Sequence, residues 1–157
     1  MLPLHLHVRP LSGSRLTIGL MYKRALAGYE KALGKDHAST VNTVYNLGRL
    51  YYGQGKFEEA EEMYKRALAG YEKALGRDHK STLDTVYNMA RLMEKQEDLE
   101  GASQMFERAF LGYRNLLGAD KSKTIDAREQ LERISHLQRK KVNTKKGFWK
   151  NLRRRLK

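Results

Sequence analysis

Residues 21–34 read MYKRALAGYEKALG, and residues 63–76 repeat the same letters without a change. A looser copy, MFERAFLGYRNLLG, occupies residues 105–118, so each copy begins 42 residues after the one before it. Between residues 21–62 and residues 63–104, 27 of the 42 aligned positions are identical. A fixed period of about 20 to 50 residues is typical of arrays in which each unit stacks on its neighbours. The repeat therefore predicts equivalent structural units along the chain.

Each unit is predicted to contain two helices. Val44 and Leu47 are followed at helical spacing by further apolar residues on the same face, which is the pattern of a helix with one buried side. The segment 53–55, Gly-Gln-Gly, interrupts that helix. A second helix with its own apolar stripe then begins near Phe57 and continues to Leu75. The unit is therefore a helix pair joined by a tight turn.

The loop between units predicts how these helices end and begin. Gly34, Gly76 and Gly118 follow the second helices, at the place where glycine commonly terminates a helix. In the first two copies the loop continues Asp-His-x-Ser-Thr. We expect a serine or threonine hydroxyl to cap the following helix. The candidate caps are Ser39, Thr40, Ser81, Thr82 and Thr124.

Three glycines fall inside the second helices. They are Gly28, Gly70 and Gly112, and an internal helical glycine costs about 1 kcal/mol relative to alanine. Their recurrence predicts a close approach by a neighbouring helix at this position. The alternative is that they are copies of an ancestral unit without a packing role.

The residues of the units resemble those of a tetratricopeptide repeat. The loop Gly-Lys-Asp-His-Ala-Ser-Thr-Val and the 42-residue period are similar to the kinesin-light-chain-like variety, known from near-identical arrays in fungal and bacterial signalling receptors. The resemblance implies an all-α fold, a short right-handed α-solenoid of antiparallel helix pairs whose first helices line the concave surface. It also implies a protein-binding scaffold or adaptor that is not an enzyme. The matching residues of the first full unit are Leu47, Gly48, Tyr51, Gly55, Ala60, Tyr64 and Ala67.

The pattern divides the chain into three parts. Residues 1–15 are predicted to be irregular, residues 16–138 to form the repeat array, and residues 139–157 to be a basic tail that is disordered or a short amphipathic helix. The last helix of the array has apolar residues only on its backward face, as a terminal cap requires. The expected parts of the array are the second-helix half-repeat 16–35, the repeats 39–76 and 81–118, and the capping helix 123–138.

The first helix of the array lacks a partner of its own. Pro3 and Pro10 interrupt the residues that would have to supply one. The packing face left uncovered carries Ile18, Tyr22 and Tyr29. Because exposed apolar patches favour association, we expect either marginal stability or self-association through this N-terminal helix.

The concave surface is predicted to bind an extended peptide. Asparagine side chains can both donate to and accept from a peptide backbone, arginines bind carboxylates with two parallel hydrogen bonds, and tyrosines offer rigid contact area. In related repeats an asparagine clamps peptide ligands, and Asn46 and Asn88 match that position. The expected partner is a protein segment with acidic features. The candidate site residues are Asn42, Tyr45, Asn46, Arg49, Tyr87, Asn88, Arg91 and Arg133.

The arginines of this surface have a second interpretation. Other positions of the same faces hold tyrosine and acids, and surface pairs between such acids and arginine are common and nearly neutral in energy. The arginines could therefore be matched within the protein itself. The neighbouring residues are Tyr52, Asp84, Glu94, Asp126 and Glu129.

The positive charge is concentrated at the C-terminus. The chain has 31 Lys and Arg against 18 Asp and Glu, a formal net charge of +13. Residues 138–157 hold ten of the cations and no acid, which leaves +3 for residues 1–137. Any argument about anionic partners therefore concerns the tail first.

The tail offers an alternative function, with the repeats as spacer or oligomeriser. A basic amphipathic segment can lie on an anionic membrane, contact nucleic-acid phosphates, or serve as an import signal or calmodulin-type target. The plain interpretation is a solvated tail without a partner. The residues concerned are Arg139, Lys140, Lys141, Lys145, Lys146, Phe148, Trp149, Lys150, Arg153, Arg154 and Arg155.

No motif indicates catalysis, a cofactor or a metal. The sequence contains no phosphate loop, H-E-x-x-H, G-x-S-x-G or dinucleotide fingerprint. It has no cysteine, and His37 and His79 supply one ligand per loop, too few for a metal site. No apolar run approaches the roughly 20 residues that span a bilayer, and the N-terminus is a poor signal peptide. We expect a cytoplasmic location, or a nuclear one through the basic clusters.

Overall fold

The computed structural model describes residues 15–155, and this part of the chain consists of helices without a strand. The expected all-α fold is thereby confirmed. Of the irregular segment expected at residues 1–15, Arg15 belongs to the first helix and residues 1–14 lie outside the described residues. The helices are α1 (Arg15–Leu33), α2 (Ala38–Gly53), α3 (Phe57–Leu75), α4 (Lys80–Lys95), α5 (Leu99–Leu117) and α6 (Ser122–Arg155).

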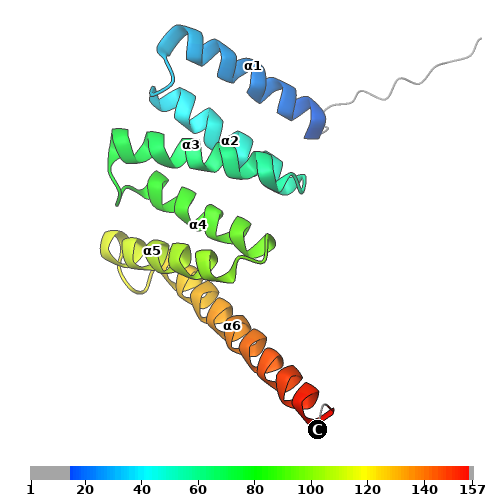
Figure 1. Ribbon diagram of the computed structural model, residues 1–157. Coiled ribbons are helices and arrows are strands. Elements are labelled where there is room, and N and C mark those ends of the chain that lie inside the picture. Colours follow the sequence, from blue (N-terminus) through cyan, green and yellow to red (C-terminus); the bar gives the residue numbers. More distant parts are fainter. Residues whose placement is uncertain (1–14, 156–157) are drawn as a thin grey trace, which may run out of the picture.

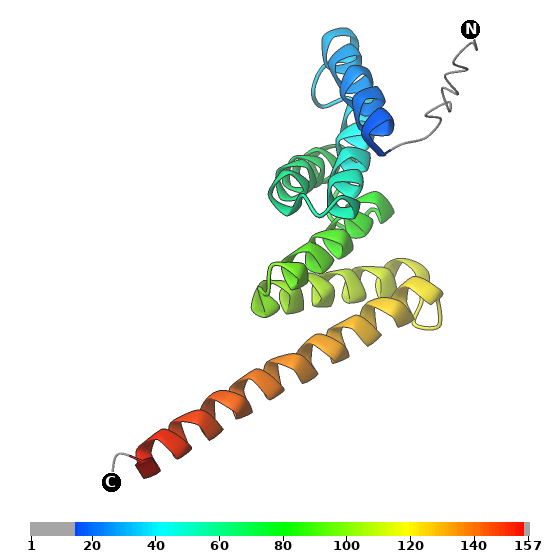
Figure 2. The same ribbon diagram turned by 90° about the vertical axis from the view of Figure 1, so that its right-hand side faces the viewer.

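The helices stack in chain order into a short solenoid. In Figure 1, α1 to α5 succeed one another along the stack, and α2 with α3 and α4 with α5 form antiparallel pairs. The helix α1 packs on α2 at one end, and α6 packs on α5 at the other. The view in Figure 2 shows that α6 continues well beyond the stack.

The core lies between the helices of each pair and between neighbouring pairs. In the first pair, Val41 and Val44 of α2 pack against Ala67 and Tyr71 of α3. The same cluster recurs 42 positions later between α4 and α5. Equivalent sequence thus gives equivalent packing, which is the basis of solenoid stability. The second cluster contains Leu83, Val86, Ala109 and Tyr113.

Two of the three internal glycines are contact points between helices. A Cβ on Gly70 would lie 2.7 Å from Cγ2 of Val41, and one on Gly112 would lie closer still to the side chain of Leu83. At Gly28 a Cβ would meet no described atom within 4 Å. The predicted close approach therefore exists at Gly70 and Gly112 and is unfilled at Gly28.

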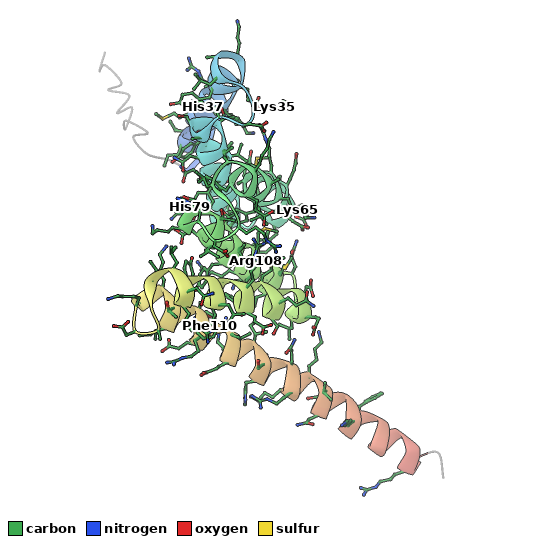
Figure 3. The ribbon with its side chains drawn as sticks, turned by 90° about the vertical axis from the view of Figure 1, so that its left-hand side faces the viewer. Lys35, His37, Lys65, His79, Arg108 and Phe110 are labelled. Carbon is green, nitrogen blue, oxygen red and sulfur yellow. The ribbon has the colours of Figure 1, made fainter. Side chains whose placement is uncertain are left out.

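The helix ends follow the predicted loop, with one correction. Gly34 and Gly76 adopt φ of 90°, the left-handed region that favours glycine. The caps of α2 and α4, however, are the loop histidines: Nδ1 of His37 accepts from the backbone N–H of Ser39 at 3.2 Å, and His79 does the same for Ser81 at 3.1 Å. His37 and His79 lie along one side of the stack in Figure 3.

The threonines expected as caps instead bind the preceding helix. The hydroxyl of Thr40 donates to the carbonyl of Gly34 at 2.7 Å, and the hydroxyl of Thr82 donates to Gly76 at 2.8 Å. Both threonines are fully buried. Serine and threonine commonly occupy the cap position, but these helices begin earlier, at Ala38 and Lys80. The threonine hydroxyl satisfies an unpaired carbonyl of the preceding helix end instead.

The last helix does not end where the capping helix was predicted to end. α6 passes residue 138 without a break and continues to Arg155. Residues 123–146 contain neither glycine nor proline, and lysine, arginine and glutamine are good helix formers. Cations near a helix C-terminus also interact favourably with its dipole. The basic tail is therefore a continuation of the capping helix.

Within residues 15–155, no helix combines the length and the apolar character needed to cross a membrane.

Candidate functional site

The first helices of the units line two adjoining hollows, which we call the groove. The first hollow has a volume of about 330 Å³ and the second about 450 Å³. They are continuous because Tyr87, Arg91 and Asp126 line both. The remaining lining residues are Tyr45, Arg49, Asp84, Asn88, Tyr113 and Lys123 in the first hollow, and Tyr52, Glu94, Lys95, Gln130 and Arg133 in the second.

The structure brings most of the predicted site residues to this groove, but not all. Two of the asparagines, Asn42 and Asn46, line neither hollow. Asn42 accepts a hydrogen bond from the hydroxyl of Tyr71 at 3.2 Å, and Asn46 is half-buried. The predicted residues that do line the groove are Tyr45, Arg49, Tyr87, Asn88, Arg91 and Arg133.

The third predicted asparagine joins two neighbouring units. Nδ2 of Asn88 on α4 donates to the hydroxyl of Tyr45 on α2 at 2.8 Å. Its carbonyl oxygen accepts no hydrogen bond from the described part of the chain. An amide has two donors and an acceptor, so one N–H and the oxygen of Asn88 form no hydrogen bond with the described residues.

One arginine of the groove is already paired. Arg133 on α6 donates from two nitrogens to the two carboxylate oxygens of Glu94 on α4, at 2.5 and 2.7 Å. The hydrogen bonds from Arg133 hold the pKa of Glu94 below its usual range. The second interpretation of these arginines, pairing within the protein, therefore describes Arg133.

The other two arginines lie over tyrosine rings. The guanidinium carbon of Arg91 is 5.2 Å from the ring centroid of Tyr52, and that of Arg49 is 5.9 Å from the centroid of Tyr45. Among the described residues, neither arginine forms an ion pair with a carboxylate. A cation over an aromatic face is attracted to it, so the rings position two guanidinium groups that form no ion pair among the described residues.

Asp84, one of the two acids that line the first hollow, is held by its own partners. Asp84 accepts a hydrogen bond from the hydroxyl of Tyr113 at 2.6 Å and pairs with Lys123 and, at 3.7 Å, with Lys80. Burial is the main reason that the pKa of Tyr113 is raised, and Asp84 raises it further. Burial likewise raises the pKa of Tyr45 and of Tyr87, so these two tyrosines and Tyr113 are neutral hydrogen-bonding groups at physiological pH.

Three groove residues, Lys95, Tyr113 and Lys123, were not expected from the sequence. Tyr113 belongs to a second helix, and Lys123 lies at the start of α6 beside the inter-unit loop. The signal for Tyr113 was its equivalence to Tyr71, because both donate to the residue 29 positions earlier. No repeat signal identified Lys123, since the residues 42 and 84 positions before it are serines.

The candidate tail residues are described only in part. The side chains of Arg139, Lys140, Lys141, Lys146 and Arg154 are exposed on α6, and Phe148 is 61% exposed. The other candidate side chains lie outside the described ones. They are Lys145, Trp149, Lys150, Arg153 and Arg155.

Among the described residues, no group of three or more His, Asp or Glu side chains converges to hold a metal ion.

Comparison with solved structures identifies the architecture as an α-solenoid of tetratricopeptide type. BtubC (BKLC) from P. vanneervenii superimposes with a TM-score of 0.71 at 20% identity, over 76% of this chain and 48% of that one. The nearly identical TPR-like repeats of a putative kinesin light chain from Podosopora anserina give a TM-score of 0.71 at 21% identity, over 76% of this chain and 57% of that one. This chain thus spans about half the length of these proteins, and the likeness is one of fold.

Family assignment rests on the sequence match. Tetratricopeptide repeat family models match residues 21–73 and residues 82–120. The chain belongs to the tetratricopeptide repeat family, and its solenoid has the fold of kinesin-light-chain-like repeats. No curated protein matches it. Repeats of this family generally mediate protein–protein interaction and are typically scaffolds without enzymatic activity.

Proposed function

We propose that this protein is a non-catalytic interaction module whose groove binds an extended, acidic segment of a partner protein. The observation that carries the proposal is the pair of cations, Arg49 and Arg91, positioned over tyrosine rings without an acid of their own. Both line the same hollow, beside the partly unused amide of Asn88. Guanidinium groups bind carboxylates with two directed hydrogen bonds, which is the chemistry of an acidic side chain.

The chain contains an internal example of the proposed contact. Arg91 and Arg133 are 42 residues apart, and so are Tyr52 and Glu94, the residues that each arginine contacts on the preceding first helix. At Arg133 the contacted residue is a carboxylate, and at Arg91 it is a phenol ring. This equivalence supports Arg91 as a place where a carboxylate supplied by a ligand takes the role that Glu94 takes within the chain.

Hydrogen bonding to the ligand backbone is assigned to Asn88. Its amide is held in place by Tyr45, with one N–H and its carbonyl oxygen remaining. An extended peptide offers one backbone N–H and one C=O per residue, so a single fixed amide can receive both. The arginines then set the preference for acidic side chains, and Asn88 sets the register.

The proposal predicts that Tyr52→Glu blocks the groove. A glutamate at position 52 reproduces the Glu94 arrangement and pairs with Arg91, which removes a charge-assisted hydrogen bond worth about 1.5–3 kcal/mol to the ligand. We expect the affinity for a fluorescein-labelled peptide of alternating glutamate and serine to fall about tenfold or more. The measurement is fluorescence anisotropy on the full-length protein.

Matched variants separate this effect from others. Tyr52→Phe keeps the ring and is expected to bind like the native protein, while Glu94→Tyr frees Arg133 and is expected to bind more tightly. All variants carry the same basic tail, so a difference between them reports on the groove. Equal binding of the acidic peptide by the native protein and Tyr52→Glu would contradict the proposal.

The tail supports a second candidate function, attachment to an anionic membrane surface. The supporting observation is that α6 continues beyond the stack with exposed cations and with Phe148 61% exposed among them. Each cation near an anionic surface contributes about 1 kcal/mol. We expect replacement of Arg139, Lys140 and Lys141 by glutamine to weaken binding to phosphatidylserine vesicles at least tenfold in a sedimentation assay. Unchanged vesicle binding, or binding only to an RNA duplex, would contradict membrane attachment.

A further inference from the structure

The same fourteen residues occur twice in this chain in two different surroundings. Residues 63–76 form most of α3, where Tyr64 is 1% exposed and Tyr71 is 6% exposed beneath α2. In the equivalent part of α1, Tyr22 is half-buried and Tyr29 is 39% exposed. The difference lies in the neighbours, because α3 has a first helix of its own, whereas α1 packs mainly on α2 within the described part of the chain. We call the uncovered side of α1 the α1 face.

The α1 face contains a notch that an aliphatic side chain fills elsewhere. Gly70 is contacted by Val41, and Gly112 by Leu83, each from the first helix of the same unit. Around Gly28 a Cβ would find no described atom within 4 Å. The notch that Val41 fills at Gly70 and Leu83 fills at Gly112 is thus also present at Gly28, where no described aliphatic side chain fills it.

Charged residues at the edges of this interface repeat in the same way. Lys73 on α3 pairs with Asp36, just ahead of α2, at 2.5 Å, and Arg66 pairs with Glu30 of the preceding second helix. Arg108 and Glu72 repeat the second pair one unit later, at 2.5 Å. The equivalents on α1, Lys31 and Arg24, have no acid partner in the described part of the chain.

We propose that the α1 face docks a helix of the α2 kind from a partner polypeptide, continuous with the interface that α2 forms with α3. The docking helix presents valine or leucine at its first contact position, further aliphatic residues three and six positions later, and glycine or alanine at the seventh. An aspartate just before the helix pairs with Lys31. This inference is independent of the groove, because no residue of the α1 face lines it.

The residues required of the docking helix argue against a second copy of this chain as the occupant. In a second copy, the first-type helix that could dock is α6. Its residues at the positions equivalent to Val44 and Gly48 are Arg128 and Glu132. A Cβ at Gly48 would already lie 2.8 Å from the ring of Tyr64, so a glutamate there does not fit. Two copies of α1 would bring Arg24 and Lys31 against their own kind. The occupant therefore carries the α2 pattern with small and apolar residues.

The test uses a labelled peptide of residues 35–53, held helical by a lactam bridge between positions 49 and 53, which are exposed on α2. We expect it to bind the full-length protein and to lose at least tenfold in affinity against Gly28→Leu, whose added side chain fills the notch. Ala27→Leu adds the same side chain one residue away, where the third unit carries the 39% exposed Leu111, and should bind like the native protein.

A peptide with Val44→Arg and Gly48→Glu, which copies α6, is expected to lose binding as well. Circular dichroism checks that Gly28→Leu stays helical. Equal affinity for the native protein and Gly28→Leu overturns the proposal. So does a native dimer in light scattering that Gly28→Leu converts to monomer while the peptide fails to bind, since a second copy would then be the occupant.

Discussion

Replacing Tyr64 with alanine is expected to remove about 3–5 kcal/mol of the free energy of unfolding, the range for truncating a large buried aromatic side chain. Tyr64 is 1% exposed and packs with Ala60, Met89 and Leu92 between two units. The stability of a domain of this size is about 5–15 kcal/mol. The variant should therefore unfold at much lower urea concentration, followed by far-UV circular dichroism.

The control is Tyr22→Ala, in the identical fourteen-residue segment. Tyr22 is half-buried on α1, and its loss should cost only about 1 kcal/mol because less apolar area is removed from contact. Equal destabilisation by Tyr22→Ala and Tyr64→Ala would show that α1 is packed as fully as α3, against the structure described here. It would also remove the basis for the α1 face.

Gly112→Leu is expected to destabilise the protein by about 2–3 kcal/mol, the usual cost of overpacking a filled interface. Any Cβ at Gly112 runs into the side chain of Leu83, which is 1% exposed. The gain of up to about 1 kcal/mol in helix propensity is outweighed. Thermal or urea unfolding of the full-length variant measures the difference.

Gly28→Leu provides the matched comparison, with the opposite sign. Nothing described lies within 4 Å of a Cβ at Gly28, so the propensity gain of up to about 1 kcal/mol is not offset. We therefore expect Gly28→Leu to raise the free energy of unfolding and Gly112→Leu, at the equivalent position, to lower it. If both variants lose stability alike, the internal glycines have a role other than close packing.

The repeat made the fold predictable because it fixes one helix pair and then copies it. Where a copied residue meets the same neighbour, the sequence argument holds, as for the close approach at Gly70 and Gly112. At the array ends the same residues meet different neighbours. Gly28 and Tyr29 then behave unlike Gly70 and Tyr71, which no pattern within α1 itself reveals.

Local chemistry limited the prediction of the helix ends. The side chain of His37 caps α2 by accepting from the backbone N–H of Ser39, although serine and threonine are more common at helix caps. The end of α6 was misjudged because the change in charge at residue 138 resembles a boundary. A change in side-chain charge does not interrupt the backbone hydrogen bonds of a helix when the residues that follow are compatible with helical structure.

The groove was predictable in its residue types but not in which of them are already paired. Arg91 and Arg133 look equivalent in the sequence, yet one stacks on Tyr52 and the other binds Glu94. The difference arises on the preceding first helix, three residues beyond the aligned arginine. Comparing that position across the units distinguishes the two arginines. The hydrogen bond that Asn42 accepts from Tyr71 depends on the direction of the asparagine side chain, which the sequence spacing does not specify.

The central claim, that the groove binds acidic side chains, is tested most directly by following the arginine Nε–Hε resonances of the full-length protein. The protein is titrated with the glutamate–serine peptide, and a glutamine–serine peptide serves as control. We expect the acidic peptide to shift the signals of Arg49 and Arg91 and to leave the signal of Arg133, which is paired with Glu94, nearly unchanged. Shifts confined to the arginines of the basic tail would contradict it.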